Sequence, residues 1–402
     1  MTATLNWLDV SAEQQRRVRE LIRLFEEPGT RDEIGVGQVR DAFSDLLFPG
    51  TSTVQTRARY FLFVPWHFQE AQRRGSTGQK LLQRVDASER RLIVHFKEAG
   101  DTRGLIGSRA GARVKILPST IYWSGLLRLG ILNGPLSHAD VAGMARHSQA
   151  GESDEMTDRS VGAWRPGMPS PPDGFPDKPI GGFDLTADEA RWLRELISVN
   201  ASGTLFAHLV NAAELSDSDF AWEQPSIANA ADAVRETLDH ARRFSVVMHG
   251  AALVYNLLVA RRYDASGFTR IASQVEHYLG EIDRWGTELR EDASRLRNDL
   301  PDFWLAVAEG NGRVAPLARA FVEQWVGLVA GADPAAAALG ETGQRLVESR
   351  VRQLRGGRSV LVNDKLLAAW PGASGAGQLD YRWGTVRTII RDIHEGLSRA
   401  AA

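Results

Sequence analysis

A short segment with the sequence PSTIYWSGLLRLGIL carries polar side chains that could bind a nucleic acid. Three of them recur at intervals of four residues, which places them on one face of a helix: Thr120, Ser124 and Arg128. Apolar residues occupy the opposite face. Hydroxyls and a guanidinium on one exposed face can donate hydrogen bonds to phosphate oxygens and to base edges. The spacing therefore predicts a helix over residues 119–129, with Ser119 as its N-cap and a polar face suited to a nucleic acid.

Positive charge lies immediately before this predicted helix, on Arg109, Arg113 and Lys115. These side chains would lie near phosphates if the helix contacts DNA. A short helix with hydroxyls and an arginine on one face resembles the recognition helix of winged helix-turn-helix domains, which enters a DNA groove. An amphipathic surface helix with a solvated polar face has the same pattern, and no clear positioning helix immediately precedes this one. The sequence alone leaves both interpretations open.

A second concentration of arginines lies near the C-terminal end, where the sequence RGGR places Arg355 and Arg358 on either side of two glycines. Two guanidinium groups on a flexible turn suit phosphate contacts or the acidic surface of a partner protein. A solvated helix face with ordinary charge pairs explains the same residues. Both arginines are therefore candidate nucleic-acid-binding residues with a structural alternative.

Patterns that would indicate catalysis or metal binding are missing from the sequence. The chain has no cysteine, which excludes disulfides, thiolate zinc sites and cysteine nucleophiles. It has no G-x-x-x-x-G-K-[ST], H-E-x-x-H or G-x-S-x-G motif, and its nine histidines show no metal-ligand spacing. His95, Lys97 and Asp101 resemble a phospholipase D-type signature, but at shorter spacing and without its asparagine. We therefore predict a non-enzymatic protein with no catalytic residues, metal or cofactor, with a divergent nuclease as the less favoured alternative.

Charge is unevenly distributed, although the whole chain is nearly neutral, with 48 Lys and Arg against 50 Asp and Glu. Residues 50–133 contain 14 basic and 5 acidic residues, a net charge of +9. Residues 134–240 contain 7 basic and 18 acidic residues, a net charge of −11. A basic segment followed by an acidic one indicates either nucleic-acid binding by the first or docking between the two.

The periodicity of apolar residues predicts a mainly α, multi-helix fold with a winged-helix-like element in the N-terminal region. Helix signals include a capping box at Thr186 and Glu189 and a first helix that follows Ser11. A stretch rich in Pro, Gly and Asp interrupts the pattern. We therefore predict three parts: 1–146, a basic helical domain; 147–183, a linker or long loop; and 184–402, a helical C-terminal domain.

One apolar segment, Phe244 to Ala260, has 17 residues and is a candidate membrane span. A spanning helix needs about 20 residues, and His249 and Asn256 within the segment are costly in lipid. We therefore predict a buried central helix. The N-terminal sequence lacks the pattern of a secretory signal, so we expect a cytoplasmic protein with no membrane partner.

Several longer stretches resemble an uncharacterised bacterial protein family: QVRDAFSDLLFPGTSTVQTRARYFLFVPW, LPSTIYWSGLLRLGI, GFDLTADEARWL, MHGAALVYNLLVARRY and WPGASGAGQLDYRW. The resemblance extends from about residue 35 to about residue 395. Proteins of that family look like accessory subunits encoded in phage-defence islands, near helicases and phospholipase D-like nucleases. The resemblance implies a subunit of a bacterial antiviral defence complex, with DNA and helicase or nuclease subunits as its partners. The alternative is a purely protein-binding scaffold for such a helicase or nuclease.

Overall fold

The computed structural model describes residues 32–150, 162–311 and 313–399. These residues form fifteen α-helices, α2 to α16, and four short 3-10 helices. No β-strand occurs among them, and their one β-type contact is an isolated bridge between Leu132 and Trp164. The prediction of a mainly α, multi-helix fold is therefore confirmed. The first predicted helix, after Ser11, lies outside the described residues.

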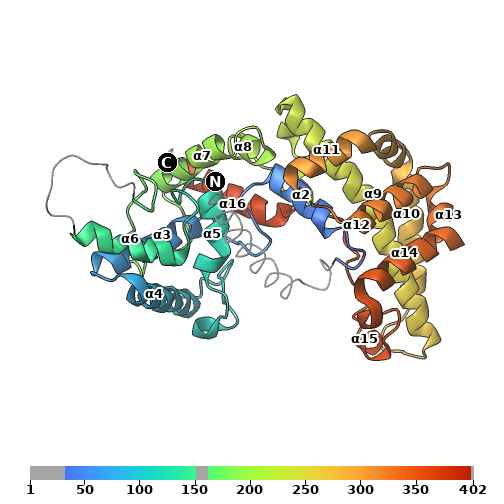
Figure 1. The fold of residues 1–402 in the computed structure, drawn as a ribbon, viewed down its shortest axis with the longest axis horizontal. Helices are drawn as coiled ribbons and strands as arrows, with labels where there is room; N and C mark the ends of the chain where they lie inside the picture. Colours follow the sequence, from blue (N-terminus) through green and yellow to red (C-terminus); the bar gives the residue numbers. More distant parts are fainter. Residues whose placement is uncertain (1–31, 151–161, 312, 400–402) are drawn as a thin grey trace, which may run out of the picture.

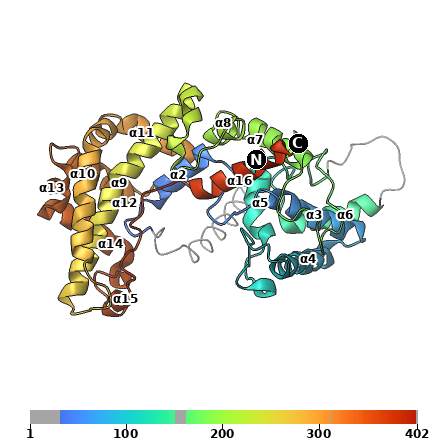
Figure 2. The same cartoon turned by 180° about the vertical axis from the view of Figure 1, so that it is seen from behind.

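Figures 1 and 2 show two groups of helices, which we name the first lobe and the second lobe. The first lobe contains α3 (Tyr60–Arg73), α4 (Gly78–Glu98), η2 (Gly111–Arg113), α5 (Pro118–Arg128), α6 (His138–Ala150), α7 (Ala187–Asn200), α8 (Leu205–Val210) and α16 (Trp383–Ser398). The second lobe contains α2 (Gly37–Leu47), α9 (Asp232–Ala265), α10 (Gln274–Asn298), α11 (Leu300–Gly310), α12 (Pro316–Val329), α13 (Pro334–Leu339), α14 (Glu341–Arg355), η5 (Gly356–Arg358) and α15 (Asp364–Ala368). The remaining 3-10 helices, η3 (Ala221–Glu223) and η4 (Pro225–Asn229), lie in the connection between α8 and α9.

Neither lobe is a continuous piece of the chain. Helix α2 comes from the N-terminal part of the sequence and packs against α9 and α11 of the second lobe. Helix α16 comes from the C-terminal end and packs against α7 and α8 of the first lobe. The packing units therefore differ from the predicted domains 1–146 and 184–402, because each segment contributes helices to both lobes.

The second lobe is built around α9, which contains the apolar segment 244–260. Among the described helices, α9 is the one that is long and apolar enough to cross a membrane, and 78% of its most apolar window is buried inside the protein. Trp285 of α10 and Trp325 of α12 donate their ring N–H groups to the α9 carbonyls of Val246 and Val247. The prediction of a buried central helix is confirmed.

The first lobe is organised around α3, whose sequence has a run of five aromatic residues within nine positions: Tyr60, Phe61, Phe63, Trp66 and Phe68. The run forms a helix, and every residue from Tyr60 to Phe68 is buried. Pro65 lies inside this helix and does not end it. A proline at this position removes one backbone hydrogen bond, and the burial of large aromatic side chains on all sides offsets that loss.

The part of the predicted linker that the structure describes, residues 162–183, is irregular but packs on the first lobe. Trp66 of α3 donates its ring N–H to the carbonyl of Pro169, at 2.8 Å. The ring of Phe175 stacks on Phe63, with 5.9 Å between the ring centroids. Phe183 is 2% exposed. This segment therefore packs against the core of the first lobe and is not only a linker.

Helix α4 begins at Gly78, ten residues before Ser88, although serine is a residue type that favours the N-cap of a helix. Ser88 lies in the middle of the helix, where its hydroxyl is 2.7 Å from Nδ1 of the buried His67. Gly100, with a φ of +78°, follows the end of the helix. The buried hydrogen bond to His67 explains why Ser88 is compatible with a helix interior.

Candidate nucleic-acid interface

Helix α5 forms where the sequence predicts it, beginning at Pro118. Its polar stripe consists of two exposed residues and one half-buried residue: Ser124, Arg128 and Thr120. The opposite face is buried on α3, and the Tyr122 hydroxyl accepts the backbone N–H of Thr56 and donates to the carbonyl of Arg57. Within the part of the chain that the structure describes, no β-hairpin wing accompanies α5.

The N-terminal end of α5 is held against α4 by a buried carboxylate. Ser119 is not the N-cap as predicted; the N-cap is Leu117. The backbone N–H and the hydroxyl of Ser119 both donate to Glu89, at 2.7 and 2.8 Å. Burial raises the pKa of Glu89 to about 7, although the two hydrogen bonds from Ser119 oppose this shift. Glu89 therefore fixes the start of α5 on α4.

Gly125 sets how closely α5 approaches the loop at Gly50. A Cβ at position 125 would lie 2.5 Å from the Gly50 carbonyl oxygen and 2.9 Å from the Phe61 ring. We expect Gly125→Ala to lower the free energy of unfolding by about 1–3 kcal/mol through overpacking, despite the better helix propensity of alanine. Urea denaturation measures the change. The control is Gly143→Ala in α6, where a Cβ meets nothing within 4 Å, and equal effects of the two substitutions would contradict the close approach.

Arg90 attaches the basic turn that precedes α5 to α4. Its guanidinium donates to the carbonyls of Ala112 and Val114, at 2.5 and 3.0 Å, and pairs with Asp86 one helical turn away. The 3-10 helix η2 is thereby held along the C-terminal half of α4. The side chains predicted to contact phosphates here, Arg109, Arg113 and Lys115, therefore extend from a backbone segment that is attached to α4.

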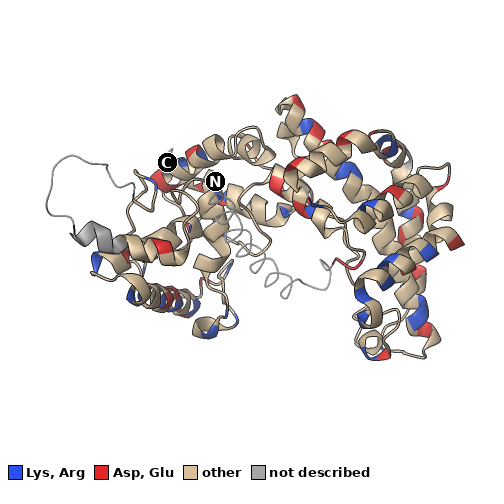
Figure 3. Cartoon of the chain, viewed as in Figure 1, with Lys and Arg blue, Asp and Glu red and all other residues tan. Residues whose placement is uncertain are grey.

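Most cations of the basic segment 50–133 form no ion pair with another described residue. Eight are exposed and have no ion-pair partner among the described residues: Lys80, Arg84, Lys97, Arg103, Arg109, Arg113, Lys115 and Arg128. Figure 3 shows Lys and Arg positions along α4 and on the turn that follows it. The predicted residues of η2 and α5 therefore belong to a larger basic surface that includes both ends of α4. We name these eight residues the α4–α5 basic surface.

In the second arginine concentration, near the C-terminal end, one of the two predicted residues already has partners within the protein. Arg355 pairs with Glu33 at 3.4 Å and donates to the carbonyl of Asp32 at 2.9 Å. Arg358 is exposed on η5 without an ion-pair partner among the described residues. On α14, Arg345 and Arg352 pair with Glu341 and Glu348 along the helix, and the buried Arg350 donates to the carbonyls of Ile34 and Gly35. These residues lie in the second lobe, so the structure does not bring them together with the α4–α5 basic surface (Figure 3).

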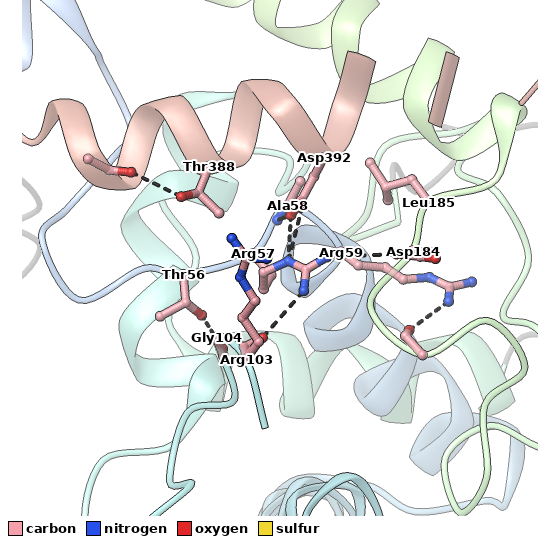
Figure 4. A network of polar contacts seen from close by, with 12 residues as sticks. Thr56, Arg57, Ala58, Arg59, Arg103, Gly104, Asp184, Leu185, Thr388 and Asp392 are labelled. Carbon is pink, nitrogen blue, oxygen red and sulfur yellow. Dashed lines mark hydrogen bonds and ion pairs between the residues drawn. The ribbon is translucent and has the colours of Figure 1, made fainter. Parts of the chain in front are cut away.

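Two arginines of the basic segment have internal roles that the sequence does not reveal. Figure 4 shows Arg57 next to Asp392 of α16, with Nε 3.0 and 2.9 Å from the two carboxylate oxygens. Asp392 also accepts the backbone N–H of Ala58, at 2.8 Å. Burial raises the pKa of Asp392, and the bonds to Arg57 oppose that shift. The pair is separated by 335 residues in sequence, which is why no local pattern predicts it.

Arg59 forms a second buried pair in the first lobe. Its guanidinium donates to Glu189 of α7 at 2.9 Å, and the two side chains are 1% and 4% exposed. It also donates to the carbonyls of Gly182 and Ile180, at 2.7 and 3.1 Å. Glu189 completes the predicted capping box with Thr186. The capping box is therefore confirmed, and its carboxylate has a second partner.

Within the described ranges, no group of three or more His, Asp or Glu side chains could hold a metal ion. Lys97 donates to the carbonyl of Arg109 at 3.4 Å. Burial lowers the pKa of His67 to about 3 and that of His138 to about 4, so both rings are neutral near pH 7 and supply no charge for phosphate.

Comparison with models of protein families identifies the family of this chain. A family model described as "Family of unknown function (DUF6361)" matches residues 2–396. The chain belongs to this family. For the DUF6361 chain, neither the curated proteins nor the solved structures include a match.

Proposed function

We propose that this DUF6361 protein binds DNA through the α4–α5 basic surface, as a non-enzymatic accessory subunit of a bacterial antiviral defence complex in the cytoplasm. The observation that carries the proposal is the set of eight exposed cations without carboxylate partners between Lys80 and Arg128. An unpaired surface cation needs to break no ion pair before it contacts a phosphate. Release of counterions from the nucleic acid then favours binding.

The antiviral part of the proposal rests on the family resemblance given above. In that resemblance such proteins look like accessory subunits encoded near helicases and phospholipase D-like nucleases, which act on nucleic acids. A subunit that holds DNA without cleaving it would serve such an enzyme by raising the local concentration of its substrate.

The proposal predicts that reversing three charges on the turn before α5 abolishes most of the binding. We expect Arg109→Glu, Arg113→Glu and Lys115→Glu together to weaken binding to a labelled 30-mer duplex by roughly 100-fold at low salt. The slope of log affinity against log salt should also fall by about 2.7, since three phosphate contacts are lost. Fluorescence anisotropy at about 50 and 200 mM salt measures both quantities.

A matched control carries the same charge change in the second lobe. Arg284, Arg295 and Arg345 are 68%, 57% and 73% exposed, and each pairs with a glutamate on its own helix. Their combined change to Glu should leave the affinity within about twofold, because the charges lie outside the proposed surface. Wild-type protein that binds no DNA at about 50 mM salt would refute the proposal.

The second candidate function is a protein-binding scaffold, which one observation favours. Part of the basic segment docks on the acidic segment within the chain itself, through the pairs Arg59–Glu189 and Arg91–Asp177. The scaffold predicts no salt-sensitive DNA affinity and a stable complex with the helicase or nuclease encoded nearby, measured by native mass spectrometry of the co-expressed proteins. A metal-dependent cleavage assay on the purified chain tests the divergent nuclease, and we expect no cleavage.

A further inference from the structure

We infer that the α4–α5 basic surface binds double-stranded nucleic acid through its phosphates, without reading base sequence. This inference rests on the proposed function and deepens it, since it names the form of nucleic acid and the mode of recognition. Three features of the structure carry it: the burial of the α5 N-terminus, the absence of an exposed aromatic side chain among the described residues, and the placement of unpaired cations near both ends of α4.

The first feature concerns the end of α5 that a recognition helix uses. In helix-turn-helix proteins the N-terminal residues of the recognition helix contact base edges in the major groove. In α5 this end is covered: Pro118 and Ser119 are buried, and Glu89 occupies the hydrogen-bonding position in front of the first turn. The exposed residues of the stripe, Ser124 and Arg128, lie toward the C-terminal end, so α5 is poorly placed to read bases.

The second feature concerns single strands. Proteins that bind single strands combine basic grooves with exposed aromatic side chains on which bases stack. The large hydrophobic side chains that are exposed in the described part of the chain are all aliphatic: Ile180, Val199, Leu305, Leu317, Leu354, Val362 and Leu366. Trp123, the tryptophan of α5, is half-buried and stacks on His138, at 3.8 Å between the ring centroids. Bases therefore find no stacking platform on the α4–α5 basic surface.

The third feature is the placement of unpaired cations near both ends of α4. Helix α4 has 21 residues and is therefore about 31 Å long. Lys80 and Arg84 lie near its N-terminal end, and the cations of the η2 turn lie along its C-terminal half, where Arg90 holds the backbone. Duplex DNA carries one phosphate per about 1.7 Å of its axis. Cations held near both ends of a straight helix match the closely spaced phosphates of a stiff duplex better than those of a flexible strand.

The experiment compares three probes of about 30 nucleotides: two duplexes of unrelated sequence and the single strand of one of them. We expect the full-length protein to bind both duplexes with affinities within about twofold and the single strand roughly tenfold more weakly. The pair Lys80→Glu and Arg84→Glu, at the far end of α4 from η2, should weaken both duplexes equally, by about tenfold. Ser124→Ala should change neither duplex affinity by more than about twofold.

The outcomes separate this inference from the function on which it rests. A preference of more than about tenfold for one duplex, reduced by Ser124→Ala, would show base readout by α5 and overturn the inference while leaving DNA binding intact. Tighter binding of the single strand would overturn it as well. Failure to bind any of the three probes would instead refute the proposed function.

Discussion

Replacing Arg59 with methionine is expected to lower the free energy of unfolding by about 3–5 kcal/mol, because the change leaves a buried carboxylate without its cation. The side chain of its partner, Glu189, is only 4% exposed, so water cannot solvate the carboxylate in place of the arginine. Two backbone carbonyls, those of Ile180 and Gly182, lose a donor at the same time. Methionine keeps much of the arginine stem's apolar volume, so the loss reports mainly on the charge and its hydrogen bonds. Denaturation in urea, followed by circular dichroism, measures the effect.

Two further variants test the cause of this loss. Adding Glu189→Gln to Arg59→Met removes the uncompensated charge while glutamine can still cap α7, so the double variant should regain at least about half of the lost stability. Arg191→Met breaks the exposed pair with Asp188, whose side chains are 49% and 82% exposed, and should cost less than about 1 kcal/mol. A loss below about 1 kcal/mol for Arg59→Met would show that the buried pair does not contribute as described.

Removal of α16 is expected to abolish cooperative folding of the first lobe, although most of that lobe lies more than 180 residues earlier in the sequence. A chain that ends at residue 382 lacks the buried face of α16, which consists of Trp383, Val386, Ile389, Ile390 and Ile393. The apolar side of α7 that packs on this face then meets water. Arg57 also loses Asp392, its charged partner.

Hydrogen exchange gives the sharpest measurement of this second effect. Amides of α3 and α7 should lose protection in the chain that ends at residue 382, whereas those of α9 and α10 in the second lobe should keep much of theirs. A chain that ends at Arg399 retains the whole of α16 and is the control. If the amides of α3 and α7 keep their protection without α16, then these helices fold without it, which would contradict the prediction.

The DNA-binding proposal and the fold depend on different members of the same arginine set. Arg57 and Arg59 add to the positive charge of the basic segment, yet their guanidinium groups form ion pairs with Asp392 and Glu189. Arg90 donates hydrogen bonds to backbone carbonyls in and after η2. A net charge counted from sequence therefore overstates what a ligand meets, and the exposed, unpaired cations are the better measure of the interface.

The local features of this chain could be predicted from the sequence because they depend on residues three or four positions apart. Helix α5 lies within one residue of its predicted range, and the capping box at Thr186 and Glu189 forms as expected. The burial of residues 244–260 of α9 follows from their mostly apolar composition. Predictions that depended on a single polar residue were less secure. Ser88 and Ser119 each carry a hydroxyl suited to an N-cap, but buried partners, His67 and Glu89, hold them inside helices.

The sequence by itself determined the helices, their apolar faces and the uneven distribution of charge, since periodicity and composition are local properties of the chain. Only the tertiary structure decided which segments pack together and which charges remain free. The packing of α2 on α9 and α11, and of α16 on α7 and α8, joins segments more than 170 positions apart, and Arg57 lies 335 positions before Asp392. Such contacts depend on the closing of long loops and on the fit of buried surfaces, neither of which leaves a pattern in neighbouring residues.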